Sequence, residues 1–110
     1  MIQGTIAKIE EKIRKVESLD DKSRNEVLSL VSTLKTEITA LSETHRDQAE
    51  SIAGFTALSA HEATRETKNA RLLTLALDGL SSSVKGFEAT HPRLVQTVNS
   101  ICDTLSNMGI

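Results

Sequence analysis

The chain has 110 residues, a length typical of a single domain, and its 13 basic and 15 acidic side chains leave a net charge of −2. No stretch carries the basic excess that phosphate contacts require, and two Phe with no Trp or Tyr supply few rings to stack on bases or to wall a small-molecule pocket. No apolar run approaches the roughly 18 residues of a membrane span. We therefore expect no nucleic-acid partner, no membrane insertion and no bound cofactor.

The first predicted helix covers about residues 2–18. Its apolar residues recur at alternating spacings of four and three, which places them on one helix face: they are Ile2, Ile6, Ile9, Ile13 and Val16. Asp20 follows as a candidate N-cap, because its carboxylate can accept a hydrogen bond from a free N–H group of the next helix. A turn is therefore predicted near Asp20.

The second predicted helix is long, about residues 21–62. The same spacing continues along it, over Val27, Val31, Leu34, Ile38, Leu41, His45, Gln48, Ile52 and Phe55. His45 and Gln48 interrupt this apolar stripe. Buried polar residues at such positions often fix the register and oligomeric state of packed helices. The alternative is that both lie where the stripe is open to water.

A third and a fourth helix, about residues 67–89 and 92–108, follow a chain reversal placed between residues 59 and 69. Their stripe keeps one phase across Pro92, over Leu73, Leu77, Leu80, Val84, Phe87, His91, Leu94, Val98, Ile101, Leu105 and Met108. A random junction would keep that phase about one time in seven, given the seven-residue repeat. We therefore predict a kink at Pro92 that preserves the chain direction. His91 is predicted to cap the fourth helix, because proline is favoured at the first helical position.

These elements predict an all-α fold with a single domain, residues 1–110: an elongated antiparallel helical hairpin or bundle of about four helices with coiled-coil-like packing. The second helix would extend about 60 Å, and the short first helix would cover only half of it. An apolar stripe left uncovered in this way predicts a homodimer. The expected interface residues are His45, Gln48, Ala49, Ile52, Ala53 and Phe55.

The C-terminal part of the chain resembles a known family. The block Phe87-Glu88-Ala89-Thr90-His91-Pro92-Arg93-Leu94 and the ending Leu105-Ser106-Asn107-Met108-Gly109-Ile110 are similar to those of small bacterial helical proteins catalogued as domain of unknown function four-four-zero-four. The segment Ser18-Leu19-Asp20-Asp21-Lys22-Ser23-Arg24 is similar to the first turn of that family. The resemblance implies a bacterial helical protein with no assigned activity, and it carries over no functional residues.

Three motifs resemble metal-binding or catalytic signatures without completing them. Glu88-Ala89-Thr90-His91 has the Glu-x-x-His spacing of di-iron bundles, but the chain holds no second copy, and Pro92 disfavours helical geometry at His91. His61-Glu62-Ala63-Thr64-Arg65 carries Arg65 where a zinc protease needs its second His. Cys102 would need a basic partner to act as a nucleophile, and His91 lies eleven residues away.

Two further features bear on location and on the chain end. Cys102 is the only cysteine, and no apolar signal segment opens the sequence, so the expected location is the cytoplasm. Gly109 can adopt the left-handed conformation that closes a helix, which would let Ile110 fold back on Leu105. The alternative for this ending is a docking tail for another protein.

We therefore predict a non-enzymatic structural or protein-interaction module that acts as a homo-oligomer, with an unidentified protein as a further partner. No catalytic, cofactor or metal residue is expected, and the positions expected to matter for structure are Asp20, His91, Pro92 and Gly109. The alternative function is a metal- or thiol-dependent activity at a site assembled across a dimer interface.

Overall fold

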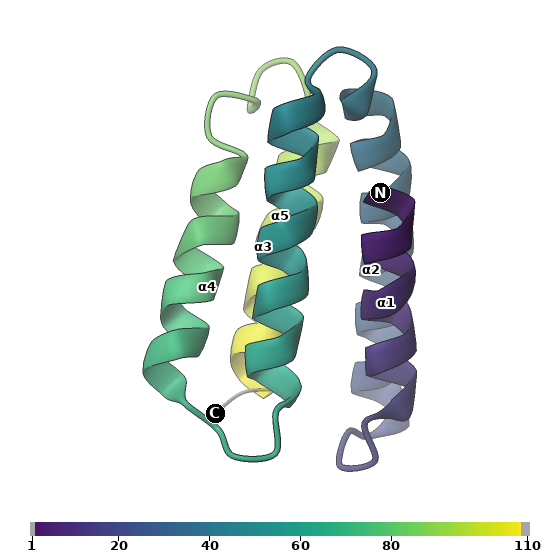
Figure 1. Cartoon of the computed structure of the whole chain (residues 1–110), viewed down its shortest axis with the longest axis vertical. Helices are drawn as coiled ribbons and strands as arrows, with labels where there is room; N and C mark the ends of the chain where they lie inside the picture. Colours follow the sequence, from purple (N-terminus) through teal and green to yellow (C-terminus); the bar gives the residue numbers. More distant parts are fainter. Residues whose placement is uncertain (1, 109–110) are drawn as a thin grey trace.

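Five α-helices, each antiparallel to the one before it, form the part of the chain that the computed structural model describes, residues 2–108 (Figure 1). They are α1 (Ile2–Lys15), α2 (Asp21–Ser42), α3 (Arg46–Thr64), α4 (Ala70–Ser83) and α5 (Pro92–Met108). The principal extents are 38 × 24 × 22 Å. The predicted all-α class is confirmed. The predicted elongated hairpin of about four helices is wrong, because the longest dimension is far below the expected 60 Å.

The helices form two layers, with α1, α3 and α4 in one layer and α2 and α5 behind them (Figure 1). Helix α3 lies at the centre and packs against all four other helices, whereas α1 and α4 lie at the two edges of their layer. The core between the layers is aliphatic. Its largest fully buried side chains include Ile6, Ile13, Leu34, Ile38, Leu41, Ile52, Leu80, Leu94, Ile101 and Leu105.

The predicted second helix is broken into α2 and α3. Helix α2 ends at Ser42, and residues 43–45 turn the chain so that α3 runs back alongside it. The backbone N–H of His45 still donates to the carbonyl of Leu41 at 2.8 Å, so the last turn of α2 closes normally. The apolar spacing does not register this turn, because each helix buries its own part of the stripe whichever way the chain continues. Of the two polar residues that interrupt the stripe, His45 lies in this turn and Gln48 in the first turn of α3, and both are exposed.

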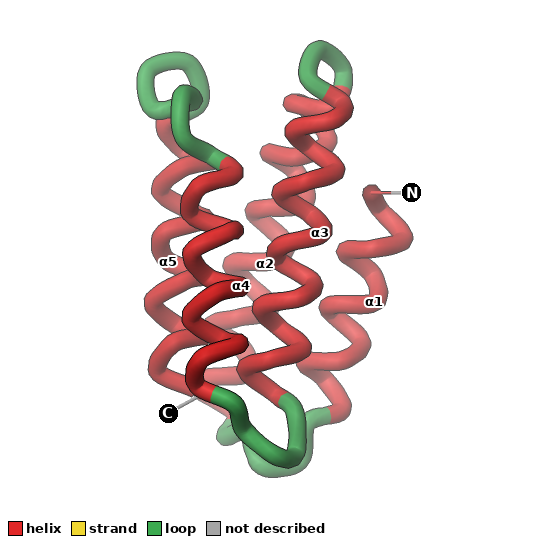
Figure 2. The backbone as a smooth tube through the Cα atoms, turned by 60° about the vertical axis from the view of Figure 1, so that its left-hand side comes forward, coloured by secondary structure: helices red, strands yellow, loops and turns green. Residues whose placement is uncertain are grey.

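The predicted kink at Pro92 is a full reversal. Helix α4 ends at Ser83, six residues before the predicted end, and residues 84–91 return the chain so that α5 runs antiparallel to α4 (Figure 2). Gly86 has φ +97°, a conformation that costs side-chain-bearing residues free energy. Val84 and Phe87, two residues of the predicted stripe, are nonetheless buried, although the loop that carries them is not helical. Continuity of the stripe therefore carried no information about direction.

The α1–α2 turn is held by the guanidinium of Arg24 on α2. It donates to the backbone carbonyls of Ile13 (3.4 Å), Leu19 (3.0 Å) and Val16, which lie at and just beyond the end of α1. The last carbonyls of a helix have no partner within the helix, so a side chain that binds them stabilises the helix end. Asp20 caps α2 on the same turn, where its Oδ1 accepts from the N–H of Ser23 at 2.8 Å. The hydrogen bonds from Ser23 hold the pKa of Asp20 below its usual value.

Replacing Arg24 tests this joint. We expect Arg24→Ala to lower the free energy of unfolding by about 1–2 kcal/mol, because three carbonyls lose a charged donor in a partly buried turn. Arg24→Lys, which keeps the charge but cannot reach several carbonyls at once, should lose less. Thermal denaturation of each variant measures the effect. The matched control is Arg14→Ala, at an exposed site on α1, and a melting temperature for Arg24→Ala equal to that of the control would contradict the assignment.

Candidate functional site

Four large apolar side chains are exposed, and all of those in the described residues lie on α3 and α4. Phe55 and Leu58 on α3 are 37% and 46% exposed, and Leu72 and Leu75 on α4 are 41% and 57% exposed. On each helix the two residues are three positions apart, so they share one side of that helix. Helices α3 and α4 pack against each other. We call the surface formed by Phe55, Leu58, Leu72 and Leu75 the α3–α4 face.

The ring of Phe55 is seated against α4 at Gly79. A Cβ atom at Gly79 would lie 2.3 Å from the ring, so the ring occupies the space that any larger residue would take. A shallow groove of about 360 Å³ continues from this ring along the seam between the two helices, and it is lined by Asp47, Gln48, Ser51, Phe55, Gly79, Ser82 and Ser83. The face is therefore apolar over its middle and polar at the end near the start of α3.

The predicted interface residues separate into two groups. Ala49, Ile52 and Ala53 are buried inside the single chain, so they are not available to a second copy. His45, Gln48 and Phe55 are exposed. Of the predicted set, only Phe55 belongs to the α3–α4 face, and Gln48 borders it. Leu58, Leu72 and Leu75 are not among the predicted interface residues.

His45 and His91 meet at the end of the bundle that carries the α2–α3 turn and the α4–α5 loop. The ring centroid of Phe87 lies 5.4 Å from that of each imidazole, and both contacts are edge-to-face. Each imidazole Nδ1 also hydrogen-bonds the hydroxyl of the preceding threonine, Thr44 at 2.8 Å and Thr90 at 2.9 Å. These contacts tie the turn and the loop together, which is a structural task.

His91 and Pro92 occupy the start of α5. Helix α5 begins at Pro92, and the carbonyl of His91 accepts from the N–H of Val95 at 3.2 Å, the bond expected of a residue that flanks a helix start. The carboxylate of Glu88 accepts from the N–H of Gly86 at 2.7 Å. Gly109, the position expected to close α5, lies outside the described residues.

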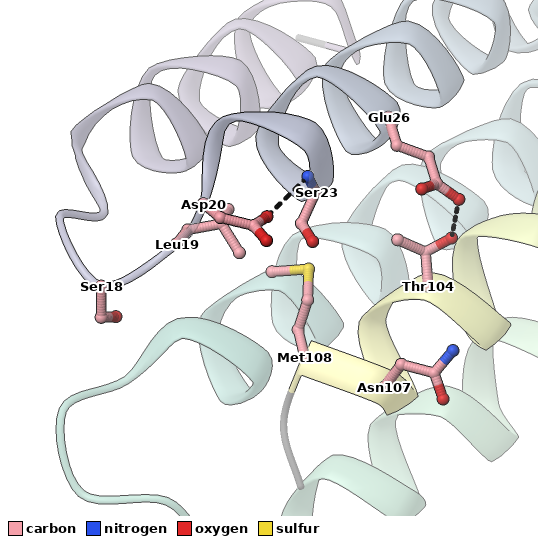
Figure 3. Close-up of a pocket in the computed structure, with 8 residues that line it drawn as sticks. All are labelled: Ser18, Leu19, Asp20, Ser23, Glu26, Thr104, Asn107 and Met108. Carbon is pink, nitrogen blue, oxygen red and sulfur yellow. Dashed lines mark hydrogen bonds between the residues drawn. The ribbon is translucent and has the colours of Figure 1, made fainter.

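A second hollow, of about 320 Å³, lies where the α1–α2 turn meets the end of α5 (Figure 3). It is lined by Ser18, Leu19, Asp20, Ser23, Glu26, Thr104, Asn107 and Met108. Both of its carboxylates have partners, since Asp20 caps α2 and Glu26 accepts from the hydroxyl of Thr104 at 3.3 Å. The bond between Glu26 and Thr104 joins α2 to α5, and neither carboxylate of this hollow lacks a partner.

Cys102 on α5 is half-buried and faces α4, where its Sγ lies 3.9 Å from the carbonyl oxygen of Leu77. Burial raises the pKa of this thiol from its ordinary value of 9.0 to about 11, with Asp103 and Asp78 adding to the shift. A nucleophilic cysteine needs the opposite shift, because the thiolate is the reactive form. The structure therefore gives Cys102 the properties of a packing residue.

Residues 2–108 contain neither a metal-binding cluster nor a membrane-spanning helix. That range contains no group of three or more His, Cys, Asp or Glu side chains placed to hold a metal ion. Within the same range, none of the helices combines the length and the apolar character required to cross a bilayer.

Comparison with known proteins identifies the family. The family model described as Domain of unknown function (DUF4404) matches residues 2–110, and the chain belongs to that family. The expected resemblance is thus confirmed over nearly the whole chain, including the middle segment. Neither the curated proteins nor the solved structures contain a match.

The raised pKa of Cys102 predicts that its thiol reacts slowly in the folded protein. At pH 8 we expect the folded protein to react with a disulfide reagent about 100-fold more slowly than the unfolded protein, because a pKa two units higher leaves about a hundredth of the thiolate. The burial of the neutral thiol also favours folding below pH 9, and that contribution is lost as pH rises through about 11. Equal rates for folded and urea-unfolded protein would contradict the burial of Cys102.

Proposed function

We propose that this member of the DUF4404 family is a non-enzymatic interaction module that works as a homodimer and buries the α3–α4 face between its two copies. The single observation behind the proposal is the gathering of all the exposed large apolar side chains of residues 2–108 on two neighbouring helices. Scattered exposed apolar residues are ordinary on protein surfaces. In this chain, their gathering on two helices that pack against each other favours a binding surface on that side of the bundle.

The two edges of the layer differ in a way that supports this proposal. Helix α1, at one edge, exposes charged residues that include Lys8, Glu11, Lys12 and Lys15. Lys15 and Glu11 form an ion pair there at 2.6 Å. Helix α4, at the other edge, exposes Leu72 and Leu75. Each exposed leucine costs about 25 cal/mol of free energy for every Å² of apolar area that it leaves in water. The leucines at the α4 edge therefore favour a partner that covers them, whereas the charged side chains at the α1 edge are suited to water.

A second copy is the partner that the geometry favours. Two antiparallel helices from each chain would pack face to face as a four-helix bundle around a twofold axis, and each copy would supply the same face to the other. This dimer differs from the one expected from the sequence. That expectation relied on an uncovered stripe through Ala49, Ile52 and Ala53, which the fold buries within one chain.

The proposal also covers location and chemistry. We propose a cytoplasmic bacterial protein, because its one cysteine remains a free thiol and because the family resemblance points to bacterial proteins. A thiol-dependent activity would require a reactive Cys102, and the raised pKa of that side chain speaks against it. The working surface in this proposal consists of helix faces.

The dimer is tested by its mass and by Leu75→Glu. We expect the wild-type protein to pass from monomer to dimer within the range from about 1 µM to about 1 mM, as measured by sedimentation equilibrium. Leu75→Glu should weaken the dimer at least about 30-fold, because it places a charge inside an apolar interface from each copy. The variant should retain its helical circular dichroism, since Leu75 is largely exposed in the monomer.

Asn99→Glu is the matched control, because it introduces the same charge at an exposed position of α5. We expect it to dimerise like the wild type. A wild-type protein that remains monomeric across the whole concentration range would refute the proposal, as would an equal loss of dimer in Leu75→Glu and Asn99→Glu.

A further inference from the structure

Helix α4 carries a positively charged side chain before Leu75 and a negatively charged one after it. Arg71 lies four residues before Leu75 and Asp78 lies three residues after it, and all three side chains are exposed. At 100° per residue these positions fall within about 60° of one another around the helix, so they form a single outward stripe. Around the helix, Leu72 lies between this stripe and the buried residues Leu73 and Ala76.

Neither charge has an ion-pair partner among the described residues. The ion pairs in that range join Lys15 with Glu11, Arg24 with Asp21, and Glu62 with both His61 and Arg65. Arg71 and Asp78 are seven residues apart, about 10 Å along the helix, so they do not meet each other on one α4. Both are therefore free to pair with groups on another molecule.

The order of these charges distinguishes two ways of pairing α4 with a second α4. In an antiparallel pair with its twofold axis near Leu75, Arg71 of each copy falls opposite Asp78 of the other, since their distances from the axis, about 6.0 and 4.5 Å along the helix, nearly match. In a parallel pair, Arg71 would face Arg71 and Asp78 would face Asp78. Like charges placed opposite one another across an interface are destabilising, so the antiparallel pair is favoured.

We infer that two copies of this chain associate with their α4 helices antiparallel, with Leu75 near the twofold axis and two symmetry-related Arg71–Asp78 ion pairs at its sides. This inference rests on the proposed homodimer and adds its orientation and register. The leucines supply most of the affinity through buried apolar area, and the two ion pairs select the orientation. Phe55 and Leu58 on α3 extend the same apolar surface beside the α4 pair.

Charge reversal tests the ion pairs. Arg71→Glu and Asp78→Arg each place two pairs of like charges across the twofold axis, and each should raise the dimer dissociation constant about tenfold at low salt. The double variant Arg71→Glu/Asp78→Arg restores opposite charges and should return the dissociation constant to within about threefold of the wild type. Circular dichroism checks that each variant folds, and these exposed positions should leave the melting temperature of the monomer unchanged within about 3 °C.

Disulfide trapping tests the register independently. In a Cys102→Ser background, Leu75→Cys should form a covalent dimer rapidly under oxidation, because the twofold axis brings the two copies of that position together. Ser82→Cys in the same background is the matched control, since it lies on the same stripe. In the antiparallel pair its two copies are about 21 Å apart, which is too far for a disulfide, whereas a parallel pair would trap both.

The outcomes separate this inference from the function on which it rests. A dimer that loses affinity in both single reversals, recovers in the double variant and traps only through Leu75→Cys supports the orientation. If the wild type dimerises but the reversals have no effect, or if Ser82→Cys traps as quickly as Leu75→Cys, the orientation is wrong and the proposed dimer stands. A protein that stays monomeric throughout overturns both.

Discussion

The close packing of α3 against all four other helices is the constraint on which this bundle depends. A central helix with four neighbours must present small side chains on several sides, and α3 does so with Ala49, Ala53, Thr56, Ser59, Ala60 and Ala63, all buried. Small residues let neighbouring helix axes approach closely. The hydroxyl of Thr56 is accommodated in this packing because it donates to the carbonyl of Ile52 at 2.7 Å. The small residues that suggested an intermolecular contact thus serve contacts within the chain.

The central position of α3 also determines which sides of the neighbouring helices remain exposed. Helices α1 and α4 flank α3 in one layer, and two helices behind them cannot cover the outer sides of both. The exposed side of α1 carries charged side chains, whereas the exposed side of α4 carries leucines. The α3–α4 face is therefore a consequence of the helix count and of the order in which the helices pack. In the proposed homodimer, this face contributes apolar side chains at its centre, with an arginine and an aspartate on one stripe of α4.

The candidate face could have been read in part from the sequence. Phe55 was found because it continues the stripe of the second predicted helix. Leu72 and Leu75 lie outside the predicted stripe that starts at Leu73, so they were not among the predicted interface residues. The stretch Leu72-Leu73-Thr74-Leu75-Ala76-Leu77 carries apolar residues on more than one side of a helix, which is a signal for burial on more than one side. Leu58 gives no comparable signal, since its exposure depends on where α4 packs.

By itself, the sequence determined that the chain is helical, most of the core residues of α1, α2, α4 and α5, and where two of the helices begin, after the cap Asp20 and at Pro92. Period and capping are local properties, so they can be read without knowing the fold. Only the tertiary structure decided that the chain reverses at residues 43–45 and 84–91. A heptad-like stripe has the same spacing whether the next helix continues or folds back, and burial is satisfied in either case. The direction of the chain, and with it the choice of the face that remains open, is fixed by which helices cover α3.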